Sequence, residues 1–352
     1  MPVAPKAPAA PAPAAAPAAP AAKPAPAVPA TPVATPERQP KYGGILVNYL
    51  AWNPPSLDPF YGSGQATYML PAMYNGLLRW DFVDTSKVIP DLAERWEVSP
   101  DGLTYTFYLR KDVKWQDGKP FSAADVQFTY DRILDKAQLA RSGTWGKFMF
   151  ELANSWKTID DYTFQIILKR PIIYFVNFLA RASSRIGPKH MFDKESLSVI
   201  PGKGEFPWGV GTGPFRVVKY EEGAIIEFVK NPYFWRKGLP YLDGVKRPII
   251  GDRATVVAAL ASGRVMLNMP WPAQTPSEIK LIQEIARGKV TIVPSYQNGP
   301  QKIQFQPGFP PMDNPKVRRA IFLAVDRWDV SERVYEGTGE PGTILDSRIF
   351  GD

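Results

Sequence analysis

The chain has 352 residues, no cysteine, one histidine and a formal net charge of +8. The absence of cysteine excludes thiol nucleophiles, disulfides, iron–sulfur clusters and cysteine-ligated zinc, without choosing between cytosol and periplasm. A single histidine excludes histidine-rich metal sites. Lysine and arginine are scattered rather than clustered, so a nucleic-acid partner is not expected. No apolar run approaches the roughly 20 residues that a membrane span needs.

Residues 1–40 differ from the rest of the chain, because they contain 16 alanines and 13 prolines. Proline lacks a donor and alanine offers little apolar area, so this segment cannot form a core. We expect a disordered linker of polyproline II character that does not affect ligand affinity. It would hold the folded part away from an upstream anchor. No signal peptide is visible.

The first elements of the folded part are predicted from local patterns. The apolar run 44–49 predicts a short strand, and the spacing of apolar residues over 68–78 predicts a helix. Residues 103–109 are rich in β-branched and aromatic side chains and predict a second strand. A turn after Trp115 requires Gly118 to adopt a positive φ.

A helix is expected directly after this turn. Ser122 is its predicted N-cap, and Asp125 at the third helical position forms a variant of the capping box. The apolar face of this helix comprises Val126, Phe128, Tyr130 and Ile133.

Further strands and helices follow in the second half of the chain. The predicted strands are 163–168, 215–220 and 225–230, and the predicted helices are 253–262, ended by Gly263, and 315–335. The last two strands are joined as a hairpin through 221–223. Strand pairs interspersed with single helices indicate a mixed α and β (α/β) fold rather than regular βαβ units.

Two motifs are candidates for a cofactor-binding site or a catalytic residue. The glycine-rich stretch 209–215 resembles a phosphate loop, but Pro214 follows its last glycine and a strand begins, whereas a phosphate loop opens a helix. Its glycines therefore predict a tight backbone crossing. His190 has no serine or carboxylate constellation nearby in sequence and is predicted to be structural. No cofactor and no catalytic residue is expected, although a pair of glycosidase carboxylates is not excluded.

The folded part contains an ordered series of motifs. The strongest are 89–96, 99–107 and 109–126, and the supporting ones are 56–59, 74–78, 211–215, 230–235 and 314–321. Together they resemble the family 5 extracytoplasmic solute-binding proteins, the dipeptide- and oligopeptide-binding components of ABC importers. The resemblance covers residues 42–349.

This resemblance implies a two-lobed clamshell of the periplasmic-binding-protein type, with an inserted subdomain in lobe one and a truncated second lobe. The implied domains are a linker at 1–40, lobe one at 41–75 and 187–293, the inserted subdomain at 76–186, and the start of lobe two at 294–352. Because most of lobe two would be missing, we expect the 352-residue chain alone not to bind peptide at micromolar concentration.

The resemblance also implies a function without covalent chemistry. The protein would be a periplasmic or extracytoplasmic monomer, tethered to the membrane through its linker. It would capture a peptide between the lobes and deliver it to ABC permease subunits. The ligand-binding residues implied by the resemblance are Ser63, Gly64, Gln65, Trp145, Asn268 and Tyr296.

Other functions remain open at this point. The transported solute could instead be a metal chelate, an opine or an oligosaccharide. A carbohydrate hydrolase with an aromatic cleft and a sensory module that signals to a membrane receptor are alternatives of different classes.

Overall fold

The structure is a computed structural model. It describes residues 39–54, 57, 59–60, 66–81, 84, 86–134, 149, 151–181, 184–192, 210–268, 274–293, 306 and 308–337. The chain divides into two compact units, Met1–Pro40 and Lys41–Asp352, and the elements below all lie in the second unit.

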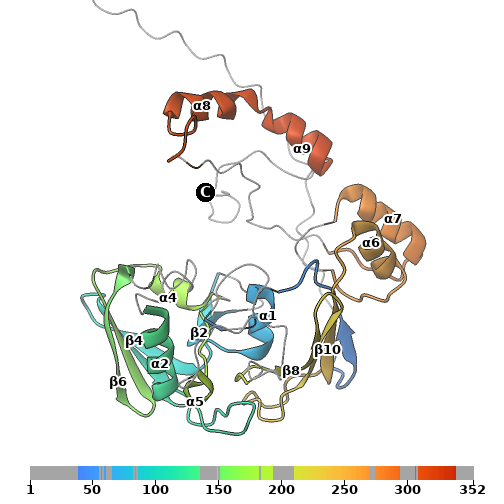
Figure 1. Ribbon diagram of the computed structural model, residues 1–352. Coiled ribbons are helices and arrows are strands. Elements are labelled where there is room, and N and C mark those ends of the chain that lie inside the picture. Colours follow the sequence, from blue (N-terminus) through green and yellow to red (C-terminus); the bar gives the residue numbers. More distant parts are fainter. Residues whose placement is uncertain are drawn as a thin grey trace, which may run out of the picture. The chain divides into compact units, whose positions relative to one another are not determined.

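Helices and strands alternate irregularly along this unit (Figure 1). The strands are β1 (Ile45–Val47), β2 (Leu78–Trp80), β3 (Val88–Pro90), β4 (Ala93–Val98), β5 (Thr104–Leu109), β6 (Ala153–Asp160), β7 (Thr163–Leu168), β8 (Phe215–Glu221), β9 (Ile225–Lys230) and β10 (Gly244–Pro248). The helices are α1 (Ala66–Met73), α2 (Ala123–Leu134), α4 (Phe175–Leu179), α5 (Lys189–Phe192), α6 (Arg253–Ala261), α7 (Pro276–Ala286), α8 (Pro315–Ala324) and α9 (Arg327–Tyr335).

The strands form two four-stranded sheets and one separate pair. The first sheet has the order β1-β10-β9-β8, in which β1 runs parallel to β10 and the other neighbours are antiparallel. The second sheet has the order β4-β5-β7-β6 and is antiparallel throughout. Strands β2 and β3 pair antiparallel with each other. The predicted mixed α and β composition is confirmed.

The second sheet and α2 enclose the main hydrophobic core. Alternate residues of β5 and β7 are buried, so that Phe107 lies opposite Phe164 and both side chains are fully buried. Helix α2 packs on β6 and β7 and begins as predicted. The Ala124 N–H donates to Ser122 Oγ over 3.3 Å, and the Ser122 N–H donates to Asp125 Oδ2 over 3.0 Å.

The predicted helix over 68–78 is wrong at its C-terminal end, because α1 ends at Met73. Gly76 lies so close to the backbone that a Cβ there would be 2.4 Å from the Ser184 carbonyl oxygen. The side chain of the preceding Asn75 donates to both carboxylate oxygens of buried Asp91, over 3.0 and 3.1 Å. These contacts with distant segments direct the chain into β2 instead of continuing the helix.

The glycines before β8 make the tight crossing that the sequence predicts. A Cβ at Gly211 would lie 1.8 Å from the Met73 carbonyl oxygen, and one at Gly213 would lie 2.5 Å from the Met73 carbonyl carbon. The Gly213 N–H donates to that same oxygen over 2.8 Å. Only a residue without a Cβ allows the end of α1 and the start of β8 to approach this closely.

The predicted single helix over 315–335 is wrong, because it is divided into α8 and α9. Val325 is extended, with ψ 112°, and ends α8. Asp326 then acts as an N-cap, since its Oδ1 accepts from the N–H groups of Trp328 and Asp329 over 2.9 and 3.1 Å. A side chain that caps a new helix competes with continuation of the old one.

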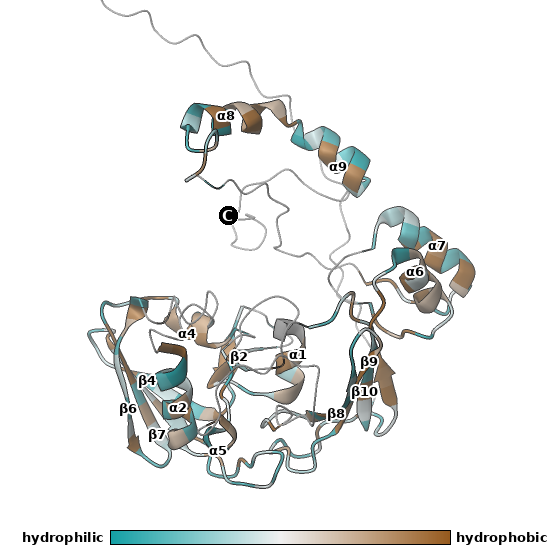
Figure 2. Cartoon of the chain, in the orientation of Figure 1, coloured by the Kyte–Doolittle hydropathy of each residue, from teal (hydrophilic) through white to brown (hydrophobic). Residues whose placement is uncertain are grey.

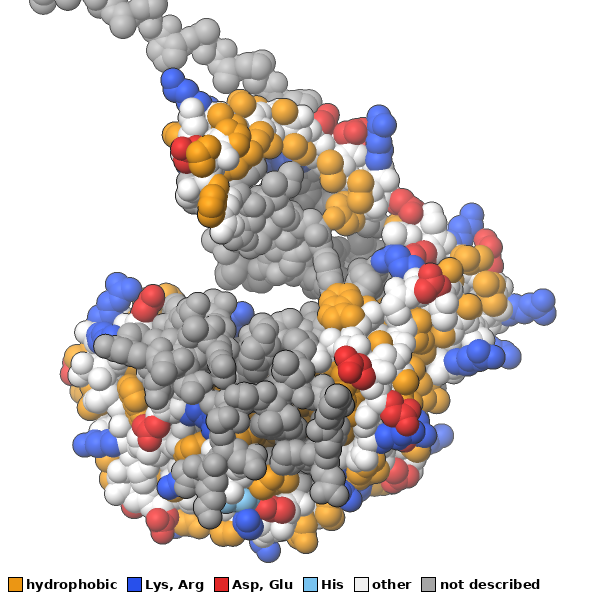
Figure 3. Space-filling model, viewed as in Figure 1, with side chains coloured by type: hydrophobic (Ala, Val, Ile, Leu, Met, Phe, Trp, Pro, Cys, Tyr) orange, Lys and Arg blue, Asp and Glu red, His pale blue; other side chains and the backbone are white. Residues whose placement is uncertain are grey.

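Helix α8 buries none of its ten residues. Figure 2 shows strongly hydrophobic and strongly hydrophilic residues together on this helix. On the face drawn in Figure 3, hydrophobic side chains gather over the segment that carries α8, where Phe309, Phe322 and Leu323 are exposed.

Candidate functional site

The carboxyl end of β1 is the best-defined place for a site among the described residues. Strand β1 has a parallel neighbour on each side, β10 on one and the segment around Leu267 on the other. The Met266 N–H donates to the Val47 carbonyl oxygen over 2.7 Å. Ligands of open α/β sheets bind outside the carboxyl ends of parallel strands. Tyr49 and Asn268, which directly follow the paired residues, lie at this edge.

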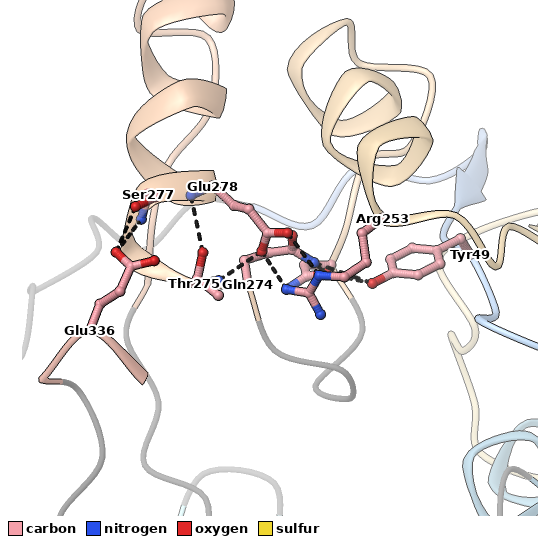
Figure 4. Close-up of polar contacts among 8 residues, drawn as sticks. Tyr49, Arg253, Gln274, Thr275, Ser277, Glu278 and Glu336 are labelled. Carbon is pink, nitrogen blue, oxygen red and sulfur yellow. Dashed lines mark hydrogen bonds and ion pairs between the residues drawn. The ribbon is translucent and has the colours of Figure 1, made fainter. Parts of the chain in front are cut away.

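Three polar side chains meet there, of which Figure 4 labels Tyr49 and Gln274. The Tyr49 hydroxyl donates to Asn268 Oδ1 over 3.1 Å. The Gln274 Nε2 lies 3.5 Å from the Tyr49 hydroxyl and 3.4 Å from Asn268 Oδ1, which are long hydrogen bonds. Tyr49 is buried and Asn268 is exposed. The buried tyrosine therefore orients an exposed amide.

Two groups beside these bonds differ in character, one being a donor and the other an acceptor. Asn268 Oδ1 is occupied by its two donors, so its Nδ2 amino group is the part of the side chain that can donate to a ligand. Gln274 Oε1 is buried and has no hydrogen-bond partner among the described residues. A donor and an acceptor close together match the amide group of a peptide backbone.

The charges beside these residues neutralise each other. Arg253 of α6 donates from Nε to Glu278 Oε1 over 2.8 Å and from its terminal nitrogen to Oε2 over 2.5 Å. Burial would raise the pKa of Glu278, but the hydrogen bonds from Arg253 and from the Thr275 backbone outweigh it and lower the pKa. Burial raises the pKa of Tyr49, so its hydroxyl stays a neutral donor. The site therefore offers polar groups without a net charge.

Helices α6 and α7 hold these groups in place. The Asp252 carboxylate caps α6 by accepting from the Thr255 N–H over 2.8 Å, and Gly263, with φ +75°, ends the helix as predicted. Beneath the polar groups, Tyr49 shares a small buried cluster with side chains of both helices. The cluster includes Val256, Val257, Leu260, Val265 and Ile282.

The sequence analysis missed α7, although a signal was present. Thr275 caps this helix by accepting from the Glu278 N–H over 3.3 Å, and Glu278 Oε2 accepts in return from the Thr275 N–H over 2.8 Å. Pro276 occupies the first helical position. A threonine followed by proline and, three residues later, by glutamate is typical of a helix start.

Of the predicted ligand-binding residues, only Asn268 can be placed. Ser63, Gly64, Gln65, Trp145 and Tyr296 lie outside the described residues. Tyr49, Gln274 and Arg253 were not predicted, because their contacts join segments that are far apart in the sequence. His190, predicted to be structural, bonds through Nε2 to Asp117 over 2.7 Å.

Two other features are absent from the described part of the chain. Within it, the acidic and histidine side chains form no group of three that could hold a metal ion. None of the helices in these same ranges combines the length and the hydrophobicity needed to cross a bilayer.

Comparison with known proteins decides the family. The family described as bacterial extracellular solute-binding proteins, family 5, middle, matches residues 87–350, which is more than half of the chain. The chain belongs to this family. The predicted resemblance is confirmed, and the family is one of solute-binding proteins whose members act outside the cytoplasm.

Curated relatives of this family 5 chain include two named for peptide ligands. The dipeptide-binding protein of Escherichia coli K12 is 30% identical over 302 residues, covering 82% of this chain and 55% of the relative. The glutathione-binding protein GsiB of Pectobacterium atrosepticum is 30% identical over 291 residues, covering 81% and 52%. The chain spans about half the length of these relatives.

Solved structures similar to the family 5 chain support the same fold. The periplasmic binding protein DppA of Helicobacter pylori, in complex with the peptide STSA, has a TM-score of 0.74 and 27% identity, covering 86% of this chain and 60% of that chain. AgaA of A. tumefaciens R10, in complex with agropinic acid, has a TM-score of 0.71 and 29% identity, covering 86% and 58%. The periplasmic-binding-protein fold is confirmed.

Proposed function

We propose that this family 5 chain is part of the substrate-binding component of an ABC importer that captures peptides outside the cytoplasmic membrane. The protein binds its solute, closes by a hinge motion and delivers the solute to permease subunits in the membrane, without covalent chemistry. Contacts that form only in the closed state drive the closure. We further propose that it acts as a monomer, is tethered through residues 1–40, and has its lobes divided as the sequence predicts.

One observation supports a peptide ligand. An exposed donor, Asn268 Nδ2, and a buried acceptor, Gln274 Oε1, lie near each other at the carboxyl edge of β1. Asn268 Nδ2 and Gln274 Oε1 are suited to the C=O and N–H of a peptide group, and the mutual neutralisation of Arg253 and Glu278 suits an uncharged backbone. Ser63, Gly64, Gln65, Trp145 and Tyr296 remain proposed contacts from the family resemblance. The dipeptide-binding and peptide-complexed relatives favour the same class.

A second ligand class is supported by one comparison. AgaA, whose structure holds agropinic acid, is 29% identical to this chain. A non-peptide solute with several hydrogen-bonding groups would also use an amide donor and an amide acceptor. The binding test therefore includes agropinic acid beside the peptides.

The test is calorimetric titration of the full-length protein that the native gene encodes. Dipeptides, tetrapeptides, nonapeptides, glutathione and agropinic acid are titrated separately, and tryptophan fluorescence is recorded as a signal of closure. We expect saturable binding of at least one peptide class. Asn268→Ala should weaken that binding about tenfold, because the lost donor leaves a ligand carbonyl unpaired.

The control is Asn154→Ala, which removes an exposed asparagine from β6 in the second sheet. It should bind peptide as the parent protein does. Saturable binding of agropinic acid without any peptide binding would replace the peptide proposal by the second class. Binding of neither would overturn the proposed function.

A further inference from the structure

The first turn of α7 joins three parts of the chain (Figure 4). Gln274, just before the helix, reaches the carboxyl edge of the first sheet. Glu278 is paired with α6. Ser277 is bound by Glu336, the residue that ends α9. The turn is therefore in contact both with the candidate site and with the α8–α9 segment (residues 308–337).

The contact between Glu336 and Ser277 has the geometry of two good hydrogen bonds. Glu336 Oε2 accepts from the Ser277 N–H over 3.0 Å and from the Ser277 hydroxyl over 2.7 Å. One carboxylate oxygen thus receives both donors of a single residue that lies 59 positions earlier in the chain. Hydrogen bonds to a charged acceptor are stronger than those between neutral groups.

The position of Ser277 explains why a carboxylate belongs there. The first N–H groups of a helix have no partner within the helix. Pro276 has no N–H, and the Glu278 N–H is taken by Thr275. The Ser277 N–H is the remaining donor of this turn, and Glu336 accepts it. The helix dipole adds to the attraction, because a negative charge is favoured at a helix N-terminus.

The backbone of Glu336 is itself held in place. Its N–H donates to the carbonyl oxygen of Ser331, and the Gly337 N–H donates to the same oxygen over 3.0 Å. Ser331 is the buried residue of α9. The carboxylate therefore extends from the ordered end of α9.

We propose that Glu336 is a positioning residue, whose carboxylate fastens the end of α9 to the first turn of α7 and thereby holds Gln274 against Tyr49 at the candidate site. The link between α9 and α7 is supported by the contacts of Glu336 with Ser277 and does not depend on the proposed function. Its effect on ligand affinity rests on the proposed function, so the two are tested by separate measurements.

The fastening is tested by distance measurements between two spin labels. The chain has no cysteine, so the exposed residues Glu284 of α7 and Glu332 of α9 can be replaced by cysteine and labelled specifically. Pulsed electron paramagnetic resonance should give one narrow distance distribution. Glu336→Ala should broaden it, and Ser277→Ala should broaden it less, because the backbone N–H remains. The double variant should be no broader than Glu336→Ala.

The matched control is Asp313→Ala, which removes an exposed carboxylate from the same segment. It should leave the distribution unchanged. The fastening is refuted if Glu336→Ala has the same distribution as the parent, or if the parent is already as broad as that variant.

The positioning effect is tested with the peptide that binds best in calorimetry. Glu336→Ala should lower the affinity for this peptide about threefold to tenfold. Adding Ser277→Ala to the Glu336→Ala variant should lower the affinity no further. Asp313→Ala should not change it. Unchanged affinity with a broadened distribution overturns the positioning role. If no peptide binds, the proposed function fails, whereas the label distances still decide the fastening.

Discussion

Gly118 is a residue that the backbone conformation of its turn requires to be glycine. Its φ is +86°, and its N–H donates to the Trp115 carbonyl oxygen over 2.8 Å. The heavy atoms nearest to a Cβ there would belong to the Tyr233 side chain, at an ordinary 3.5 Å. Gly118→Val should therefore destabilise the fold through backbone conformation, by about 1–2 kcal/mol in the free energy of unfolding. Denaturant titration measures this.

The control for this variant is Gly308→Val, because Gly308 has no positive φ and a Cβ there would meet no heavy atom of the described residues beyond its chain neighbours within 4 Å. It should change the free energy of unfolding by less than about 0.5 kcal/mol. Equal midpoints for the two variants would mean that the turn at Gly118 does not need a glycine.

Thr212 is a fully buried residue whose hydroxyl makes two hydrogen bonds with Asn75. It donates to Asn75 Oδ1 over 3.1 Å and accepts from the Asn75 N–H over 3.3 Å. Thr212→Val keeps the shape and removes both bonds, so it should cost about 1–3 kcal/mol of the free energy of unfolding. Thr106→Val is the control, because Thr106 is only half-buried and its hydroxyl accepts from Gln165 Nε2 over 3.1 Å. Equal losses would contradict the assigned role of burial.

At the scale of elements, α7 should make the stability of the fold pH-dependent. The folded-state pKa of Glu278 is lowered, so the unfolded chain binds this proton more readily. Stability from this group is present above its ordinary pKa of about 4.3 and is lost as the pH falls through the folded pKa. Between about pH 5 and pH 3, the unfolding midpoint of Glu278→Gln should fall less than that of the parent.

Glu284→Gln is the control for this pH effect, since Glu284 is exposed on the same helix. Its midpoint should follow the parent curve. If the curves for Glu278→Gln and the parent run parallel, Glu278 does not contribute to the pH dependence.

At the scale of the whole molecule, the alanine- and proline-rich segment is expected to be independent of the fold. Removing residues 1–40 should not change the thermal midpoint by more than about 1 °C, because the segment offers no apolar core. Removing residues 1–49 should lower it by several degrees, since β1 is then lost from between β10 and Leu267. A fall of several degrees with the shorter deletion would mean that residues 1–40 pack on the fold.

The sequence by itself determined the elements whose causes are local. The capping of α2 by Ser122, the alternation along β5 and β7, the hairpin of β8 and β9, and the turn glycine Gly118 depend on residues within a few positions of one another. The ordered motifs also indicated the family. Asn268 could be predicted as a site residue only through that resemblance.

Tertiary structure decided what depends on distant partners. Helix α1 ends at Met73 because Gly76 meets Ser184, and Tyr49 finds Asn268 across 219 positions. Neither contact leaves a period or a motif in the sequence. Such pairs form only after many other contacts have closed the intervening loop, so the packing of the whole fold, rather than local preference, selects them.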